Sequence, residues 1–340
     1  MFETEKKRYV FAGEKAELHT PVLMLFFNRP EQFFKVFEQV AMVRPEKLFL
    51  YQDGPRCNRN DVPGINECRD VLNRINWDCE VQTWFRDKNY GCDPSEYLSQ
   101  KWAFSEVDRC IVLEDDDVPS KSFFFFCEEL LERYKDDERI NMISGMNTLG
   151  IYNDEESDYF FSTMCSIWGW ASWRRVIESW DETYAFLDNS SVVENMLALK
   201  DSTQLEVLIQ AARSHKKSGI PFYETILATD MFLNHRINIV PSKNLISNIG
   251  IAASSTHSAD SIEKIPHGIR RVFNMETYEF DLPLRHPRYM VEDIAYQKKV
   301  KRIMGWGHPF ICCWRGIDSK LLRIQYKINK ILRGKRENEI

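Results

Sequence analysis

The chain has no long uninterrupted hydrophobic run. No apolar stretch approaches the roughly 18 consecutive apolar residues that a membrane-spanning helix needs. The first twenty residues are charged and mixed, without an apolar region before a small-residue cleavage site. We therefore expect a protein that is neither transmembrane nor secreted through a classical signal peptide.

Cysteine spacings typical of metal sites are also missing. Nine cysteines are present, but no two form a Cys-x-x-Cys pair. Several, such as Cys110 and Cys127, lie in apolar runs, where a reduced thiol packs as a small hydrophobic group. This usage favours a reducing compartment, and we expect a cytoplasmic protein.

Neither glycine-rich phosphate loop occurs, because the chain contains no G-x-G-x-x-G and no G-x-x-x-x-G-K-[ST]. Internal repeats and low-complexity linkers are absent as well. If the chain binds a nucleotide, a metal ion together with Arg or Lys must neutralise the phosphate charge.

What the chain does have is an ordinary globular composition with an uneven charge distribution. Its 340 residues are 44% hydrophobic and 28% charged, enough for one large core or one core with a smaller lobe. Residues 298–336 contain twelve Lys or Arg and one acid, Asp318, whereas the rest of the chain is acidic. A basic tail on an acidic body indicates two different partners, and nucleic acid is not expected to be one of them.

Buried strands alternate with helices along the first 113 residues. Apolar runs at 22–27, 47–51, 80–85 and 110–113 predict strands, and apolar periodicity at 31–43, 67–75 and 94–105 predicts helices. Further on we expect helices at 123–134, 204–218 and 222–236, and strands at 139–144 and 236–241. This order predicts an α/β fold with a mainly parallel sheet flanked by helices on both faces.

Polar residues follow each of the first four predicted strands. Parallel strands place these loops together at the carboxyl edge of the sheet, where open α/β folds bind ligands. We expect one crevice to contain Asn28, Arg29, Asp53, Arg86, Asn89 and the run from Glu114 to Asp117.

The run Glu114-Asp115-Asp116-Asp117 is the most informative stretch of the sequence. It leaves a buried strand and enters a loop that Pro119 closes. Four adjacent carboxylates near an apolar interior must be compensated by a cation or by hydrogen-bond donors. Oxygen ligands of this kind suit Mg²⁺ or Mn²⁺. The alternative is an acidic turn that caps the helix beginning near Ser122.

Three tryptophans lie between residues 168 and 173. Their spacing fits neither a helical stripe nor a clean strand alternation. Aromatic faces stack on sugar rings, so we predict an acceptor or sugar subsite at Trp168, Gly169 and Trp170. Core packing of a compact loop is the alternative for any single Trp.

Taken in order, six short motifs resemble a bacterial group of nucleotide-sugar glycosyltransferases with the GT-A fold, similar in their core to the N-acetylglucosaminyltransferase I type. The resemblance covers about residues 20–260. The motifs are Phe27-Asn28-Arg29-Pro30, Tyr51-Gln52-Asp53-Gly54-Pro55-Arg56, Arg86-Asp87-Lys88-Asn89-Tyr90-Gly91, Leu113-Glu114-Asp115-Asp116-Asp117-Val118-Pro119, Trp168-Gly169-Trp170-Ala171-Ser172-Trp173, and Asn248-Ile249-Gly250 with Thr256-His257.

The resemblance implies roles for the acidic run. Glu114-Asp115-Asp116 matches the family's form of the DxD motif, in which the last acid binds the metal that bridges the donor diphosphate. Asp117 stands where a neutral residue is common in this group, so Asp116 and Asp117 are both candidate metal ligands. His257 matches a late histidine that often reaches the metal or the diphosphate.

Further roles carried over from the family concern the donor and the chemistry. Asp53 matches an acid that contacts the nucleoside, Asn28 and Arg29 flank the base, and Arg86 lies beside the nucleotide. Asp230 falls where such enzymes usually place the catalytic base, and Glu224 is our second candidate for that role.

The function expected from the residues and the resemblance is metal-dependent transfer of a hexosyl or N-acetylhexosaminyl group from a nucleoside-diphosphate sugar. The acceptor would be a hydroxyl of a glycan or lipid-linked molecule in surface polysaccharide synthesis, and the resemblance favours inversion. Two alternatives remain open: nucleotidyl transfer, and noncatalytic carbohydrate binding.

We predict three parts in the chain: a charged leader at 1–19, a catalytic module at 20–260, and a basic extension at 261–340. Apolar residues of the extension fall mostly on one helical face, at Leu321, Leu322, Ile324, Ile328, Ile331 and Leu332. Such a helix is typical of peripheral attachment to an anionic membrane surface, here the inner face of the cytoplasmic membrane. A helix docked on the protein is the alternative.

Overall fold

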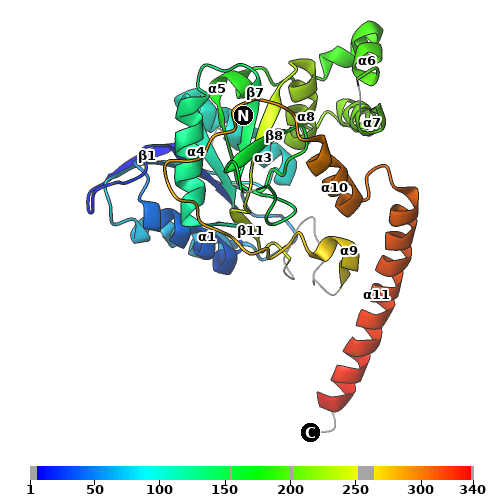
Figure 1. Cartoon of the computed structure of the whole chain (residues 1–340). Helices are drawn as coiled ribbons and strands as arrows, with labels where there is room; N and C mark the ends of the chain where they lie inside the picture. The colour runs from blue at the N-terminus through cyan, green and yellow to red at the C-terminus, as the bar shows by residue number, and fades with distance from the viewer. Residues whose placement is uncertain (1–5, 154, 200–201, 252–263, 338–340) are drawn as a thin grey trace.

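A central sheet organises the structure. The computed structural model describes residues 6–153, 155–199, 202–251 and 264–337. In this part of the chain, nine strands form one sheet in the order β1-β4-β3-β2-β5-β9-β7-β10-β8. They are β1 (Lys7–Phe11), β2 (Val22–Phe26), β3 (Lys47–Gln52), β4 (Cys79–Phe85), β5 (Arg109–Glu114), β7 (Ile140–Ser144), β8 (Tyr159–Ser162), β9 (Trp170–Trp173) and β10 (Ile237–Pro241). Figure 1 shows the strands of the body with helices around them, and labels β1, β7 and β8 of this sheet.

Most strands point the same way. β4, β3, β2 and β5 are parallel neighbours, and β7 and β10 are parallel to each other. β9 joins β5 to β7 by antiparallel pairing with both. β1 and β8 are antiparallel strands at the two edges. The predicted mainly parallel α/β sheet is therefore confirmed.

Helices cover both faces of the sheet. Their bounds are α1 (Pro30–Val43), α2 (Val62–Arg69), α3 (Cys92–Glu106), α4 (Lys121–Arg133), α5 (Arg174–Glu178), α6 (Ser190–Leu197), α7 (Ser202–Ser218), α8 (Tyr223–Leu233), α9 (His267–Arg270), α10 (Ile294–Met304) and α11 (Pro309–Glu337). α1 follows the pattern expected of an amphipathic helix, because Pro30 occupies its first turn and its apolar residues point to the core.

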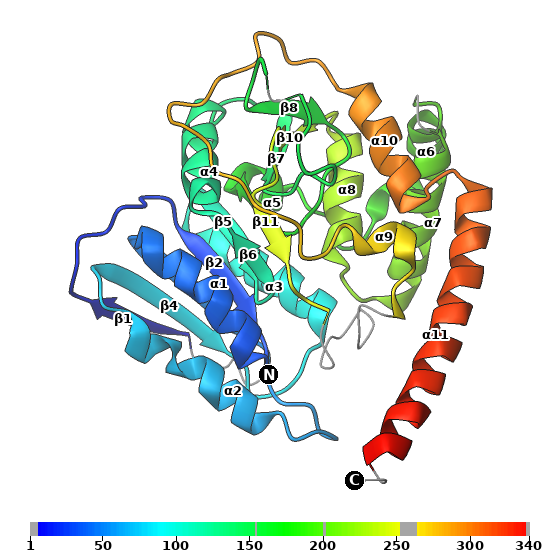
Figure 2. The same ribbon diagram turned by 60° about the horizontal axis from the view of Figure 1, so that its bottom comes forward.

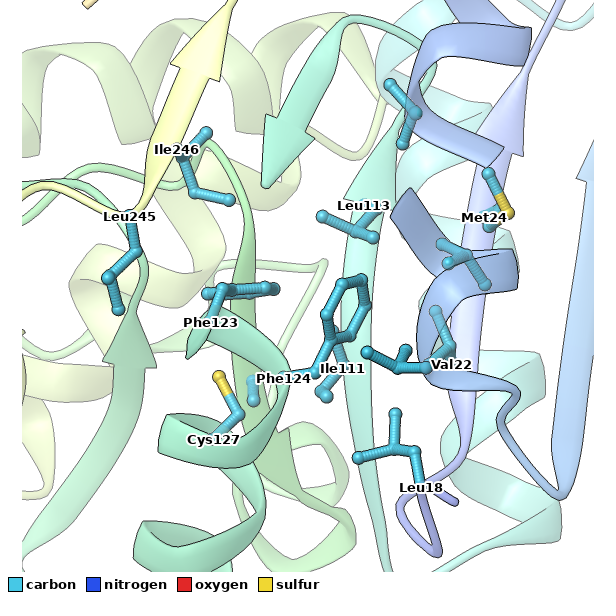
Figure 3. Packing of buried hydrophobic residues seen from close by; sticks show 14 of the residues in the cluster. Leu18, Val22, Met24, Ile111, Leu113, Phe123, Phe124, Cys127, Leu245 and Ile246 are labelled. Atoms are coloured by element: carbon cyan, nitrogen blue, oxygen red, sulfur yellow. The ribbon is translucent and has the colours of Figure 1, made fainter. Parts of the chain in front are cut away.

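Successive side chains of a strand enter opposite cores. On β5, Ile111 and Leu113 pack with α1 and α4 on one face, as Figure 3 shows for Ile111 and Phe124. Cys110 and Val112 pack with α3 and α8 on the other face. Both faces of β5 are buried, which explains why the strand appears in the sequence as a continuous apolar run.

Four local expectations need correction. The predicted leader contributes edge strand β1, paired with β4. The helix expected at 67–75 begins at Val62 and continues after Arg69 as a 3₁₀ turn to Arg74. The acidic loop contains β6 (Asp117–Pro119), which pairs with β11 (Ile246–Asn248). The tryptophan segment contains strand β9.

Residues beyond 260 also pack on the sheet. Val272 and Leu284 are buried in the core that contains α1 and α4. Tyr296 and Val300 of α10 pack against Val240 of β10. α11 leaves the body beside α9 and α10, and its C-terminal half stands apart from the rest of the ribbon (Figure 2). Among the described residues, no helix combines the length and apolar character required to cross a bilayer.

Candidate active site

The acidic run lies at the centre of the sheet's carboxyl edge. β2 and β5 are adjacent parallel strands, and the chain runs from β2 to β3 on one side while β5 lies on the other. This reversal is a topological switch point, where open α/β sheets bind ligands. Arg29 follows β2 and Glu114 ends β5, so the fold brings together two segments that are 85 residues apart in sequence.

Arg29 is the cation that compensates the acidic run. Its Nε donates to Asp115 Oδ2 at 3.2 Å, its Nη2 bonds Asp115 Oδ1, and its Nη1 lies 3.0 Å from Asp116 Oδ2. Burial alone would lower the pKa of Arg29, but the Asp115 and Asp116 carboxylates raise it above its usual value. The protein's own guanidinium therefore supplies part of the neutralisation that the sequence argument assigned to a metal.

Asp116 and Asp117 differ in what they offer a ligand. Burial, followed by the charge of Asp115, raises the pKa of Asp116 to about 6. Asp117 is fully buried, and its carboxylate accepts from the Gly169 N–H at 2.9 Å, the Glu114 N–H at 3.4 Å and Asn248 Nδ2 at 3.1 Å. Asp117 thus points into the protein and holds the turn, which is a correction to its predicted role as a metal ligand.

Residues in and just after β11 contact the acidic turn, Glu114 to Asp117. Asn248 Nδ2 donates to both Asp116 Oδ1 and Asp117 Oδ1 at 3.1 Å. The next glycine, Gly250, passes so close that a Cβ there would lie 2.2 Å from Asp116 Oδ2. These contacts fix the register of the two aspartates.

Asp53, the predicted nucleoside contact, and Asn89, predicted to share its crevice, bind each other. Asp53 accepts from Asn89 Nδ2 at 2.8 Å and from the N–H groups of Gly54, Tyr90 and Gly91 at 2.9 to 3.0 Å. Burial raises the pKa of the Asp53 carboxyl, although these backbone N–H groups act in the opposite direction. The pair joins the loops after β3 and β4, and so shapes the edge of the predicted crevice.

Asn28 and Arg86 lie on the same edge. Asn28 Nδ2 donates to Asp61 Oδ1 at 2.7 Å. Arg86 is buried, its guanidinium carbon lying 4.3 Å from the Trp84 ring centroid and 4.2 Å from that of Tyr90. Its Nε has no hydrogen-bond partner among the described residues.

A second acidic group adjoins the turn on the α3 and α8 side. Burial, then the charges of Glu96 and Asp117, raises the pKa of Glu114 well above its usual range. Burial also raises the pKa of Glu96, on α3, to about 8, with smaller contributions from the charges of Glu224 and Asp116. Glu224 is solvent-exposed in the first turn of α8. The fold therefore gathers carboxylates from β5, α3 and α8 in one region.

Asp230, our first candidate for the catalytic base, is part of a buried ion pair. Its Oδ2 lies 2.6 Å from Arg236 Nη1 and accepts from Ser179 Oγ at 3.0 Å, while Asn234 Nδ2 donates to its Oδ1 at 2.9 Å. Six residues of helix separate it from Glu224, a rise of about 9 Å. The carboxylate is only 5% exposed and is occupied by three side chains, so the geometry gives Asp230 a structural role and offers its catalytic prediction no support.

The tryptophan prediction also needs correction. Trp170 is 1% exposed and stacks on Phe104, so it has no face for a sugar. Gly169 has φ +62° and lies against Ile246, and its N–H holds Asp117. Trp168 alone remains half-buried, with its ring centroid 5.1 Å from that of Phe273. The segment belongs mainly to the core, and only Trp168 is left for a sugar subsite.

The described residues contain no group of three or more His, Cys, Asp or Glu side chains arranged to hold a metal ion. His257, the other predicted metal contact, lies outside the described residues. Mg²⁺ and Mn²⁺ do not require an all-protein cage, because they commonly bind through one or two carboxylates together with substrate phosphates. A metal at this turn therefore stays a prediction, and Asp116, already contacted by Arg29 and Asn248, is the carboxylate that such a shared site would use.

Sequence reasoning missed three residues of this region. Asn248 and Gly250 belong to a motif that we noted but to which we assigned no role. Glu96 carries no sequence signal, because it lies on a predicted helix like any solvated acid. Only the packing of α3 against β5 and α8 brings it beside Glu114.

Comparisons with known proteins give little further information. No family model matches the chain, and no curated protein matches it. Among solved structures, a cytidylyltransferase from Leptospira borgpetersenii serovar Hardjo-bovis is similar over 47% of this chain, with 10% sequence identity and a TM-score of 0.30. The matched region spans 63% of that protein's own chain. This degree of likeness assigns no activity to the chain.

Proposed function

We propose that the chain is a glycosyltransferase that moves a sugar from a nucleoside-diphosphate sugar to a hydroxyl of a glycan or lipid-linked acceptor, with inversion. The observation that carries the proposal is the arrangement of Arg29, Asp115 and Asp116 at the switch point between β2 and β5. A cation and two carboxylates at this position suit a ligand that brings both a diphosphate and a divalent metal.

In this proposal Asp116 is the residue that would hold Mn²⁺ or Mg²⁺. Among the three aspartates of the run it is the most exposed, with 11% of its side chain accessible, compared with 5% for the side chain of Asp115 and a fully buried Asp117. When bound, the metal would neutralise charge that develops on the departing diphosphate. Arg29 already lies against Asp116, and would stabilise the same charge from the protein side.

Glu224 takes the role of general base in place of Asp230. An acceptor hydroxyl is a poor nucleophile until a carboxylate removes its proton, and this removal contributes roughly 10²- to 10⁴-fold to the rate. Glu224 is exposed, and its charge acts on Glu96 beside the acidic turn. A carboxylate at the rim of the site is accessible to an acceptor, whereas the buried Asp230 is not.

Donor contacts complete the proposal. We place the nucleoside at the carboxyl ends of β2, β3 and β4. Asn28 follows β2 there, and the Asp53–Asn89 hydrogen bond joins the loops after β3 and β4. Arg86 has a buried Nε without a partner in the described chain, and we assign it to the nucleotide as well. Trp168 remains the candidate for sugar stacking.

Release of nucleoside diphosphate tests the proposal. Purified full-length protein would be incubated with individual nucleoside-diphosphate sugars, Mn²⁺ and a bacterial lipid extract as the source of acceptor. Glu224→Gln is expected to reduce turnover by at least 10²-fold and to leave donor binding unchanged. Glu194→Gln, an exposed carboxylate on α6, is the matched control and should leave both unchanged.

Other outcomes distinguish the alternatives. Release of pyrophosphate from a nucleoside triphosphate would indicate nucleotidyl transfer. Sugar binding without release of any nucleotide product would indicate a noncatalytic carbohydrate-binding protein. Full turnover by Glu224→Gln would reject the base assignment while leaving the reaction class intact.

A further inference from the structure

A basic cavity of about 830 Å³ lies between α9, α10 and the first turns of α11, away from the acidic turn. Its cationic lining consists of Arg271, Lys299, Arg302 and Arg315, joined by His267. The one acid on the lining, Asp318, accepts from the backbone N–H of His267 at 2.8 Å and lies 3.0 Å from its ring Nδ1. The cavity therefore has an excess of positive charge in a protein whose body is acidic.

The cations of this cavity are not neutralised by the fold. Arg271 and Arg302 are exposed, and neither has an ion-pair or hydrogen-bond partner within the described part of the chain. The Lys299 ammonium lies 4.6 Å from the centroid of the Tyr152 ring and has no ion-pair partner among the described residues. Arg315 donates to the carbonyls of Ile303 and Met304 at the end of α10, but its buried Nε has no partner among the described residues.

On α11, the apolar residues Ile311 and Trp314 line the cavity beside Arg315 and Asp318, and an exposed apolar stripe runs along the helix from there. Trp314 lines the cavity and is 66% exposed. The same helix face carries further exposed apolar residues at intervals of three and four: Phe310 (88%), Ile317 (46%), Leu321 (56%) and Ile324 (55%). Leu322, on another face, is buried at 7%, and α11 contacts α9. Over residues 309–326, whose side chains are described, the fold packs against one side of the helix and leaves the apolar stripe exposed.

The geometry points to an anionic membrane surface as the occupant of this region: a lipid phosphate enters the cavity beside Arg271 and Arg302, and the α11 stripe lies in the bilayer interface. Charge selects a membrane over a second copy of the chain, because α11 contains eight Lys or Arg and two acids. Two such helices would repel each other along an apolar seam. Basic helices with an apolar face and aromatic residues are typical of anionic lipid interfaces.

This inference does not depend on the transfer reaction. It assigns the cavity to a lipid headgroup, whereas the acidic turn is assigned to the donor. Figure 2 shows α11 and α9 on one side of the molecule, with the free half of α11 clear of the body, so a bilayer can contact the stripe without displacing a described element.

Vesicle co-sedimentation of the full chain tests the inference. The vesicles would contain phosphatidylcholine alone, or phosphatidylcholine with about one-third phosphatidylglycerol. Wild-type protein is expected to bind the mixed vesicles and to bind the neutral vesicles much more weakly. Arg271→Ala with Arg302→Ala should weaken binding to the mixed vesicles by roughly 20- to 30-fold, because each basic residue near an anionic surface contributes about a fivefold factor.

Matched variants separate charge from apolar contact. Arg8→Ala with Arg139→Ala removes the same charge from two exposed residues outside this region, and should leave binding within about twofold of wild type. Phe310→Ser with Leu321→Ser should reduce binding to both kinds of vesicle. Val10→Ser, at an 87% exposed residue of β1, is its control.

Three results would overturn the inference. Equal binding to neutral and mixed vesicles would show that the protein does not recognise an anionic lipid headgroup. A second contrary result would be saturable binding of inorganic phosphate that is lost in the Arg271→Ala and Arg302→Ala double variant, without any binding to vesicles. The cavity would then be a site for soluble anions. A dimer measured by light scattering that dissociates in the Phe310→Ser and Leu321→Ser double variant, again without vesicle binding, would identify a second copy as the occupant.

Discussion

Replacement of Asp230 by Asn tests whether this carboxylate stabilises the fold rather than taking part in catalysis. Asp230 is 5% exposed and Arg236 is 8% exposed, and their charged atoms lie 2.6 Å apart. Loss of one partner leaves a buried guanidinium without a counter-charge, which typically costs 3–5 kcal/mol. Asn keeps the shape of Asp and can still accept from Ser179, so we expect a loss near the lower end, about 3 kcal/mol.

Urea denaturation followed by circular dichroism measures this loss. Glu224→Gln is the matched variant on the same helix, and its exposed side chain should change the free energy of unfolding by less than about 0.5 kcal/mol. In a double-mutant cycle, Arg236→Met combined with Asp230→Asn should cost less than the sum of the two single variants, with a coupling of about 2 kcal/mol. A cost below about 1 kcal/mol for Asp230→Asn, or an equal cost for Glu224→Gln, would refute the assignment of the two carboxylates.

Three more predictions concern residues in and behind the candidate site. Gly250→Ala should weaken binding of a nucleotide-sugar donor at least tenfold in calorimetric titrations, because its Cβ would lie 2.2 Å from an oxygen of Asp116. Burial raises the pKa of Glu96 to about 8, so between pH 4.5 and 8 the folded chain retains a proton that the unfolded chain has lost. Glu96 therefore lowers the free energy of unfolding as pH rises through this range. Glu96→Gln should remove this contribution, which is at most about 1.4 kcal/mol per pH unit. Trp170→Ala should lower the free energy of unfolding by about 3–5 kcal/mol, whereas Trp168→Ala should lower it by clearly less, because Trp168 is only half-buried.

The parallel core of the sheet was predictable because its strands are buried on both faces. Runs such as residues 110–113 are apolar without interruption, and polar or Gly/Pro-rich turns bound them. The same pattern predicted that the loops after these strands share one edge, where the candidate site lies, since carboxyl ends of parallel strands meet there. Edge strands were harder to predict. β1 has one exposed face and a mixed sequence, so residues 7–11 were interpreted as part of a leader.

The roles of individual side chains depended on contacts that no local pattern encodes. Glu224 and Asp230 lie on one helix, and only the packing of α8 against the sheet decides that Asp230 meets Arg236 while Glu224 faces solvent. The predicted cation at the acidic run was partly supplied by Arg29, which sequence reasoning had assigned to the donor base. In both cases the residue types were identified, but their partners became known only from the fold.

Thermal unfolding in the presence of candidate donors tests most directly whether the acidic turn recognises a metal-bound nucleoside diphosphate. The full-length chain would be heated with single nucleoside-diphosphate sugars, each with Mn²⁺ or with a chelator. We predict a rise in melting temperature for at least one donor that requires Mn²⁺ and disappears in Asp116→Asn. Donor stabilisation that persists in the chelator and in Asp116→Asn, or no stabilisation by any donor, would contradict the account.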